Sequence, residues 1–207
     1  MNTAIRTETL PLPLPRQHPG ARRQQIAGIC LSENAIAEYN AILHALHEQA
    51  PQVDADQVIS LARWLQVQPA ETAAATLHER MARVESLRCM LNDADWEFSS
   101  AFAQRARQLL DYVCRFDDLI PDELPLVGHL DDALLVELSW PALAGEVRDY
   151  SDFRRFNLET KPRGTPNERR LTWESICLAE ANRLRQQRDI RQRGYARPQP
   201  LTSLRVC

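Results

Sequence analysis

The sequence predicts an all-α protein, folded as a compact bundle of six or seven helices. Three observations support this fold class. Hydrophobic residues recur at spacings of three and four over most of the chain, as they do on one face of a helix. Signals that start and stop helices follow one another in series. No segment shows the alternation expected of a strand. The chain has 207 residues, of which 44% are hydrophobic, and this is enough to build a buried core.

Residues 1–25 are predicted to form a disordered, proline-rich N-terminal tail. Four prolines lie close together there, at positions 11, 13, 15 and 19, and such a run favours the extended polyproline II conformation. The first helix is expected after this tail, capped by Ser32 and ending near Gln49. Its buried face would consist of Ile36, Tyr39, Leu43 and Leu46.

Two further helices follow with clear start signals. Asp54 and Gln57 have the spacing of a capping box, which opens a helix to about Val67. Pro69 begins a longer helix that ends near Leu91. The residues expected to face inward from these two helices are Val58, Leu61, Ala62 and Leu65 in the first, and Leu77, Met81, Val84, Leu87 and Leu91 in the second.

A Pro-Gly elbow near the centre of the chain is predicted to join two helices into a hairpin. The helix before it is expected to begin at Asp93 or Asp95, with an apolar side made of Phe98, Phe102, Leu109 and Val113. Pro121 has no backbone N–H and disfavours helical geometry at Ile120, so this helix must end before the elbow.

The elbow itself should be non-helical because it contains Pro125 and Gly128, and Gly128 can adopt a positive φ. Asp131 or Asp132 is then predicted to cap the second helix of the hairpin, where a carboxylate also suits the positive end of the helix dipole. The apolar face of this second helix would consist of Leu130, Leu134, Leu135 and Leu138.

The C-terminal part is predicted to contain one long, basic helix. The second hairpin helix should end near Tyr150, followed by a polar loop over residues 151–164. Thr165 and Glu168 form a capping box that opens a helix running to about residue 193 and stopping at Gly194. Its arginines, the candidate binding residues for an anionic partner, are Arg183, Arg185, Arg188, Arg191 and Arg193.

The elbow carries the most specific pattern in the chain, D-x-I-P-D-x-x-P-x-x-G-x-x-D-D. It consists of Asp118, Ile120, Pro121, Asp122, Pro125, Gly128, Asp131 and Asp132. This pattern resembles the signature of the YkvA-like family, a short helical domain of unknown function found mostly in bacteria. The resemblance covers about residues 110–150 and implies a helical hairpin without implying a reaction. Some members of that family look membrane-associated. In this chain, polar residues and Pro141 interrupt the apolar run before the roughly 18 residues that a membrane span needs.

Charge is distributed unevenly along the chain. Residues 161–207 contain eleven basic and four acidic side chains, whereas residues 1–160 contain 14 basic and 24 acidic ones. We therefore divide the chain into the tail of residues 1–25, a helical domain of residues 26–160 that includes the hairpin, and a basic C-terminal part of residues 161–207. A basic segment of this kind either clasps the acidic body or docks on an anionic partner.

The sequence also indicates the compartment. The five cysteines are an odd number and lie far apart, which argues against a secreted disulfide framework. No charged start followed by a long apolar stretch marks a signal peptide. We expect a cytoplasmic protein, with a peripheral location at the inner membrane as the alternative.

Two groups of side chains were considered as metal ligands. The first contains Asp117, Asp118 and Asp122, with His129, Asp131 and Asp132 nearby, and clustered carboxylates can hold Mg²⁺ or Ca²⁺. Pro121 interrupts the continuous helix on which carboxylates at this spacing would share one face, so we predict no tight metal site here. His44 and His47 are three residues apart, but no third ligand is visible and a solvated face is expected.

The sequence contains no recognisable nucleophile motif, phosphate-binding loop or dinucleotide fingerprint. We therefore expect no catalytic residue and no cofactor. The first hypothesis is a non-enzymatic interaction or regulatory module that docks on another protein through its arginine-rich helix. The alternatives are a peripheral protein on an anionic membrane surface and a metal-dependent enzyme that uses the aspartates. Nucleic acid is a weaker candidate partner, because no helix-turn-helix surrounds the arginines.

Overall fold

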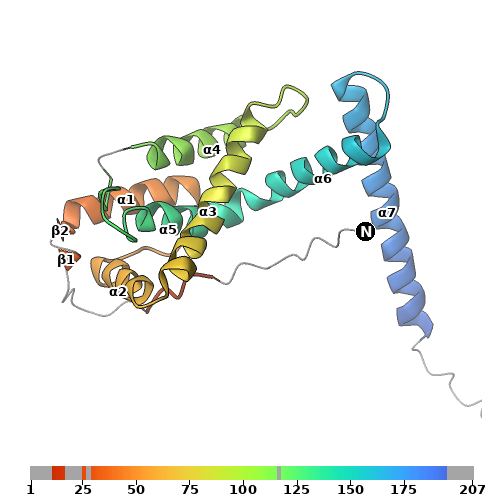
Figure 1. Cartoon of the computed structure of the whole chain (residues 1–207). Helices are drawn as coiled ribbons and strands as arrows, with labels where there is room; N and C mark the ends of the chain where they lie inside the picture. Colours follow the sequence, from red (N-terminus) through yellow and green to blue (C-terminus); the bar gives the residue numbers. More distant parts are fainter. Residues whose placement is uncertain (1–10, 17–24, 27–28, 116–117, 195–207) are drawn as a thin grey trace, which may run out of the picture. The chain divides into compact units, whose positions relative to one another are not determined.

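The computed structural model describes residues 11–16, 25–26, 29–115 and 118–194, and for residues 25, 26, 29 and 192–194 it describes the backbone only. Over these residues the chain forms seven α-helices, one 3-10 turn and a pair of two-residue strands (Figure 1). The predicted all-α class is confirmed. The chain divides into two compact units, Met1–Ser151 and Asp152–Cys207.

The first four helices are α1 (Glu33–Leu46), α2 (Ala55–Gln66), α3 (Ala70–Leu91) and α4 (Ser100–Val113). The predicted N-terminal capping residues are confirmed for two of these helices, α1 and α2. The Ser32 hydroxyl accepts a hydrogen bond from the Ala35 N–H at 3.1 Å. Asp54 and Gln57 form a complete capping box. Before α1, the strands Gln25–Ile26 (β1) and Ile29–Cys30 (β2) pair in antiparallel orientation.

The prediction that Asp93 or Asp95 begins α4 was wrong. The N-cap is Ser99, whose hydroxyl accepts from the Phe102 N–H. The Asp93 carboxylate is used elsewhere, because it accepts hydrogen bonds from the Asp95 N–H at 2.9 Å and from the Tyr150 hydroxyl at 2.9 Å. These contacts stabilise a non-helical link between α3 and α4.

The second half contains α5 (Leu130–Ser139), the 3-10 turn η1 (Trp140–Ala142), α6 (Ala144–Thr160) and α7 (Pro166–Gly194). The polar loop expected over residues 151–164 is mostly helix, since α6 continues to Thr160. Phe153 is fully buried within this stretch, so an apolar contact that the polar composition concealed supports the helix. The capping box of α7 is confirmed, with the Thr165 N–H donating to the Glu168 carboxylate at 2.8 Å.

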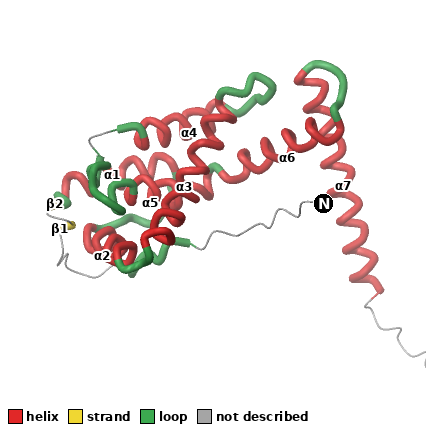
Figure 2. Tube along the Cα trace, in the orientation of Figure 1, coloured by secondary structure: helices red, strands yellow, loops and turns green. Residues whose placement is uncertain are grey.

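Helix α5 forms the centre of the first unit, where it contacts α1, α3 and α4 (Figure 2). Every residue from Leu130 to Val136 is buried. One contact of α5 with α3 is ionic, because the buried Arg80 guanidinium lies 3.2 Å from the Glu137 carboxylate. The buried face of α3 is rotated slightly from the predicted one. Arg80 and Met90 are buried, whereas Met81 and Leu91 are only partly buried.

Part of the predicted N-terminal tail lies against the helical body. Leu12 is only 7% exposed, and the Gln57 side chain donates a hydrogen bond to the Pro15 carbonyl at 2.6 Å. The rest of the predicted tail, residues 1–10 and 17–24, lies outside the described residues. Within the described part of the chain, no helix combines the length and hydropathy that crossing a membrane requires.

Candidate functional site

In the elbow between α4 and α5, two backbone segments lie very close together. A Cβ atom added at Gly128 would lie 2.3 Å from the Asp122 carbonyl oxygen, so glycine is required there. Glycine is therefore needed at position 128 because it has no side chain. Gly128, which can adopt a positive φ, does not have one here. The positive φ of the elbow is at Leu126 instead, at 68°.

Asp131 holds the elbow and does not cap α5, contrary to prediction. One of its carboxylate oxygens, Oδ2, accepts hydrogen bonds from the Tyr112 hydroxyl at 3.0 Å and from the Leu119 and Ile120 N–H groups at 3.1 and 3.2 Å. The N-cap of α5 is His129, which makes no capping hydrogen bond through its side chain. Because the chain doubles back before α5, the backbone donors of residues 119 and 120 meet the carboxylate instead.

Two tyrosines extend this network to the neighbouring helices. The Tyr39 hydroxyl, from α1, donates to the Asp131 carbonyl oxygen at 3.0 Å. The rings of Tyr39 and Tyr112 meet edge to face at 5.8 Å. Through these contacts Asp131 connects α1, α4, α5 and the elbow, which identifies it as a structural residue of the first unit.

Asp132 lies in a different group of polar side chains, with Asp122 and His129. The His129 Nδ1 atom lies 2.9 Å from Asp122 Oδ1 and 3.5 Å from Asp132 Oδ2. Asp132 is 1% exposed, and its Oδ1 atom is buried without a hydrogen-bond partner. The three side chains therefore converge from the elbow and the first turn of α5. We call Asp122, His129 and Asp132 the elbow triad.

At this site, burial and mutual repulsion make it unfavourable for several aspartates to be negatively charged at once. Burial, followed by repulsion from Asp118, raises the pKa of Asp131 to about 8. The pKa of Asp132 is raised to about 8 for the same two leading reasons, with Asp122 adding further repulsion. A proton or a bound cation would relieve this repulsion.

The structure brings together only part of the aspartate group considered from the sequence. Asp117 lies outside the described residues. Asp118 lies near Asp131 and Asp132, as its effect on the pKa of both shows. Pro121 does prevent a continuous helix here, but a continuous helix is not needed to bring carboxylates together. The elbow folds back, and it therefore places Asp122 beside His129 and Asp132.

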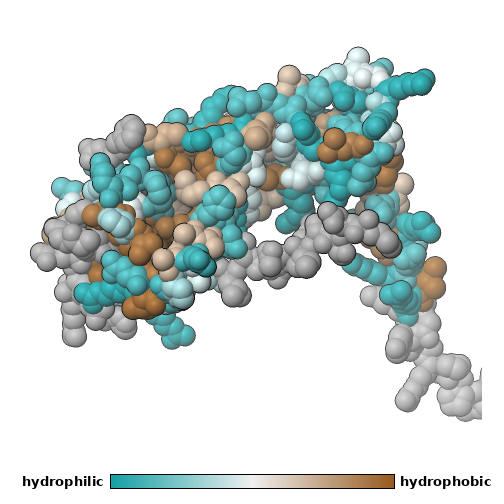
Figure 3. Space-filling model, viewed as in Figure 1, coloured by the Kyte–Doolittle hydropathy of each residue, from teal (hydrophilic) through white to brown (hydrophobic). Residues whose placement is uncertain are grey.

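The arginines of α7 form the second candidate surface. Every side chain from Glu174 to Arg191 is exposed. Among the described residues, none forms an ion pair with Arg183, Arg185, Arg188 or Arg191, and the side chain of Arg193 lies outside the described part. On the face of α7 seen in Figure 3, hydrophobic and hydrophilic residues are mixed.

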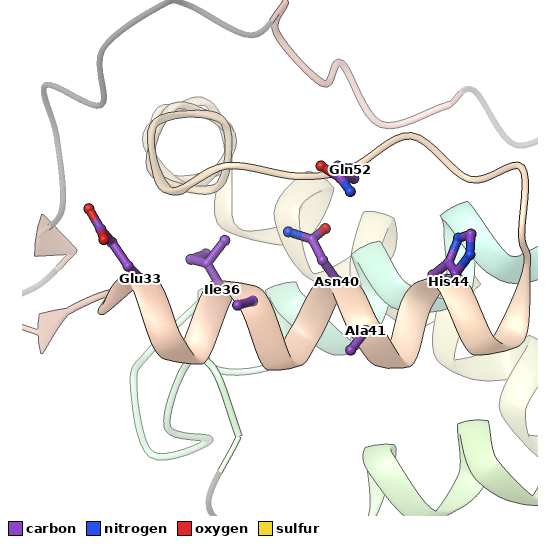
Figure 4. Close-up of a pocket in the computed structure, with 7 residues that line it drawn as sticks. Glu33, Ile36, Asn40, Ala41, His44 and Gln52 are labelled. Atoms are coloured by element: carbon purple, nitrogen blue, oxygen red, sulfur yellow. The ribbon is translucent and has the colours of Figure 1, made fainter.

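A third feature is a groove of about 480 Å³ along α1, which includes His44 and Asn40 (Figure 4). Gln52 lies across it, from the segment that follows α1. The Asn40 amide bonds the Val53 backbone in both directions, at 2.7 and 2.8 Å, so it is a structural residue. His47 is also structural, because its Nδ1 atom lies 2.9 Å from the Leu138 carbonyl oxygen.

Comparison of the chain with protein-family models, with curated proteins and with solved structures finds no match. One sequence signal pointed to the elbow site: Asp131 and Asp132 stand inside an otherwise apolar segment, and charged residues in such a segment are seldom buried without a partner.

Proposed function

We propose that this protein is a non-enzymatic, cytoplasmic interaction module of the YkvA-like type, which docks on an acidic surface of another protein through α7. The observation that carries this proposal is the exposure of α7. A helix without packing contacts is marginal in water, yet the part from Glu174 to Arg191 is exposed throughout. Its arginines suit carboxylate-rich partners, because a guanidinium can bind a carboxylate through two hydrogen bonds.

The hydrophobic side chains of α7 favour a protein over a lipid surface. Leu178, Leu184 and Ile190 are 64%, 52% and 69% exposed. At about 100° per residue, successive members of this set point about 120° apart around the helix. A helix that lies on a membrane needs its apolar residues on one face. A protein groove can surround several sides of the helix, and it would bury more of these three side chains.

The test compares two variants with the same change in charge. Replacing Arg185, Arg188 and Arg191 by glutamine should abolish capture of the partner from a lysate of the native cell, and binding of that partner once it is purified. Binding by the unmodified protein should weaken as the Debye length falls from about 30 Å at 0.01 M salt to about 10 Å at 0.1 M. The control variant replaces the exposed Arg63, Arg107 and Arg115 of the first unit, and it should bind normally.

Three outcomes would contradict the proposal. Binding that survives the α7 substitutions would exclude these arginines as the docking residues. If the unmodified protein bound phosphatidylglycerol vesicles as tightly as it binds the partner, and the α7 variant did not bind them, the membrane alternative would be favoured. A loss of thermal stability well beyond the roughly 0.5 kcal/mol usual for surface substitutions would show that the arginines bind the chain's own acidic residues.

A further inference from the structure

We infer that the elbow triad, Asp122, His129 and Asp132, is a binding site for one divalent transition-metal ion. This inference is independent of α7 and of the proposed docking function. Each side chain offers one ligand atom, and these three atoms all lie within 4.8 Å of one another. One imidazole with two carboxylates is a ligand set suited to Zn²⁺ or Mn²⁺.

The two distances from His129 to the carboxylates are close to those of ligands around a common ion. With metal–ligand bonds of about 2.0–2.2 Å, neighbouring ligand atoms lie about 2.8–3.1 Å apart in octahedral geometry and about 3.3–3.6 Å apart in tetrahedral geometry. His129 Nδ1 is 2.9 Å from Asp122 Oδ1 and 3.5 Å from Asp132 Oδ2. An ion could therefore be accommodated with small side-chain movements and without a change in the backbone.

The second, independent observation is the state of Asp132. Its side chain is 2% exposed, His129 is its one ion-pair partner among the described residues, at 3.5 Å, and its Oδ1 atom has no hydrogen-bond partner. A polar side-chain oxygen buried without a hydrogen-bond partner is costly in either protonation state. A cation held by both carboxylate oxygens of Asp132 would supply the partner that Oδ1 lacks.

The surroundings of the triad indicate a site with open coordination positions. His129 is 53% exposed and Asp122 is 28% exposed, so the ion would be reached from solvent. Three protein ligands leave at least one position for water or for a ligand of the partner. The nearby Asp118 carboxylate, which lies outside the ligand set, would add negative charge and strengthen attraction for a cation.

The experiment is a calorimetric titration of the full chain with Mn²⁺ and Zn²⁺. Four exposed thiols, at positions 30, 89, 114 and 177, would bind Zn²⁺ themselves, so all cysteines are alkylated first. Mn²⁺ prefers oxygen and nitrogen ligands and is the cleaner probe. We expect one ion per chain at micromolar affinity, with a rise in melting temperature when the ion is in excess.

Two substitutions and a matched control decide the outcome. Asp132→Asn keeps the shape of the side chain, and His129→Gln changes an exposed one, so at least one variant should fold like the parent protein. Each should weaken Mn²⁺ binding by about tenfold or more. His78→Gln removes an exposed histidine of α3 and should bind normally. The inference is overturned if no saturable site is found, or if binding is unchanged in either folded variant.

Discussion

Replacing Gly128 by alanine is expected to destabilise the first unit by about 3 kcal/mol or more, which is at the upper end of overpacking effects. The added Cβ atom would lie 2.3 Å from the Asp122 carbonyl oxygen and 2.8 Å from its carbonyl carbon. Both are backbone atoms, so no side-chain rotation can relieve the contact. The elbow would have to open, and the hydrogen bonds of Asp131 would be strained with it.

The matched control is Gly145→Ala. An added Cβ at Gly145 meets nothing within 4 Å, and the residue lies in the first turn of α6. Because alanine is the better helix former by up to about 1 kcal/mol, this variant should be as stable as the parent or slightly more stable. Urea unfolding of both variants gives the comparison. If Gly128→Ala unfolded at the same urea concentration as the parent, the close approach at the elbow would be wrong.

The sequence was a good guide wherever the signal for an element is local. The caps at Ser32 and Asp54 and the box at Thr165 depend on side chains three residues away, and all three are formed as predicted. A proline or a capping hydroxyl acts on its own turn of backbone. Such features can be predicted before any tertiary contact is known.

The errors lie where a distant residue decides. The Tyr150 hydroxyl and the Asp95 N–H bind the Asp93 carboxylate, and Ser99 caps α4 instead. Phe153 is buried, and the polar stretch around it is helical. Neither contact is visible in the spacing of residues along the chain. Tertiary contacts of this kind regularly outweigh local propensity.

The elbow site combines both situations. The pattern of prolines, glycine and aspartates predicts a tight turn with carboxylates near the start of a helix. It does not predict which donors each carboxylate meets, because this depends on how far the chain folds back. As a result, Asp131 could be taken for a cap although it binds Leu119 and Ile120. The convergence of Asp122 with His129 was missed for the same reason.

Asp131→Ala is the second substitution for which a large effect is expected, and Asp131→Asn is its matched control. Alanine would leave the buried N–H groups of Leu119 and Ile120 and the Tyr112 hydroxyl without their acceptor. Each buried donor without a partner costs about 1–3 kcal/mol. Removing a carboxylate that burial and Asp118 disfavour offsets part of this cost. The net expectation is a loss of about 3 kcal/mol in the free energy of unfolding.

Asparagine keeps an oxygen at the same place and removes the charge. Its carbonyl oxygen can still accept from both backbone N–H groups, and repulsion by the neighbouring aspartates is abolished. We therefore expect Asp131→Asn to lie within about 1 kcal/mol of the parent protein, because the amide keeps the acceptor oxygen and nearly the shape of the carboxyl group that it replaces. Thermal and urea unfolding at neutral pH would measure both variants. If alanine and asparagine were equally destabilising, the charge of Asp131 would matter more than its role as an acceptor. If both were neutral, Asp131 would not hold the elbow.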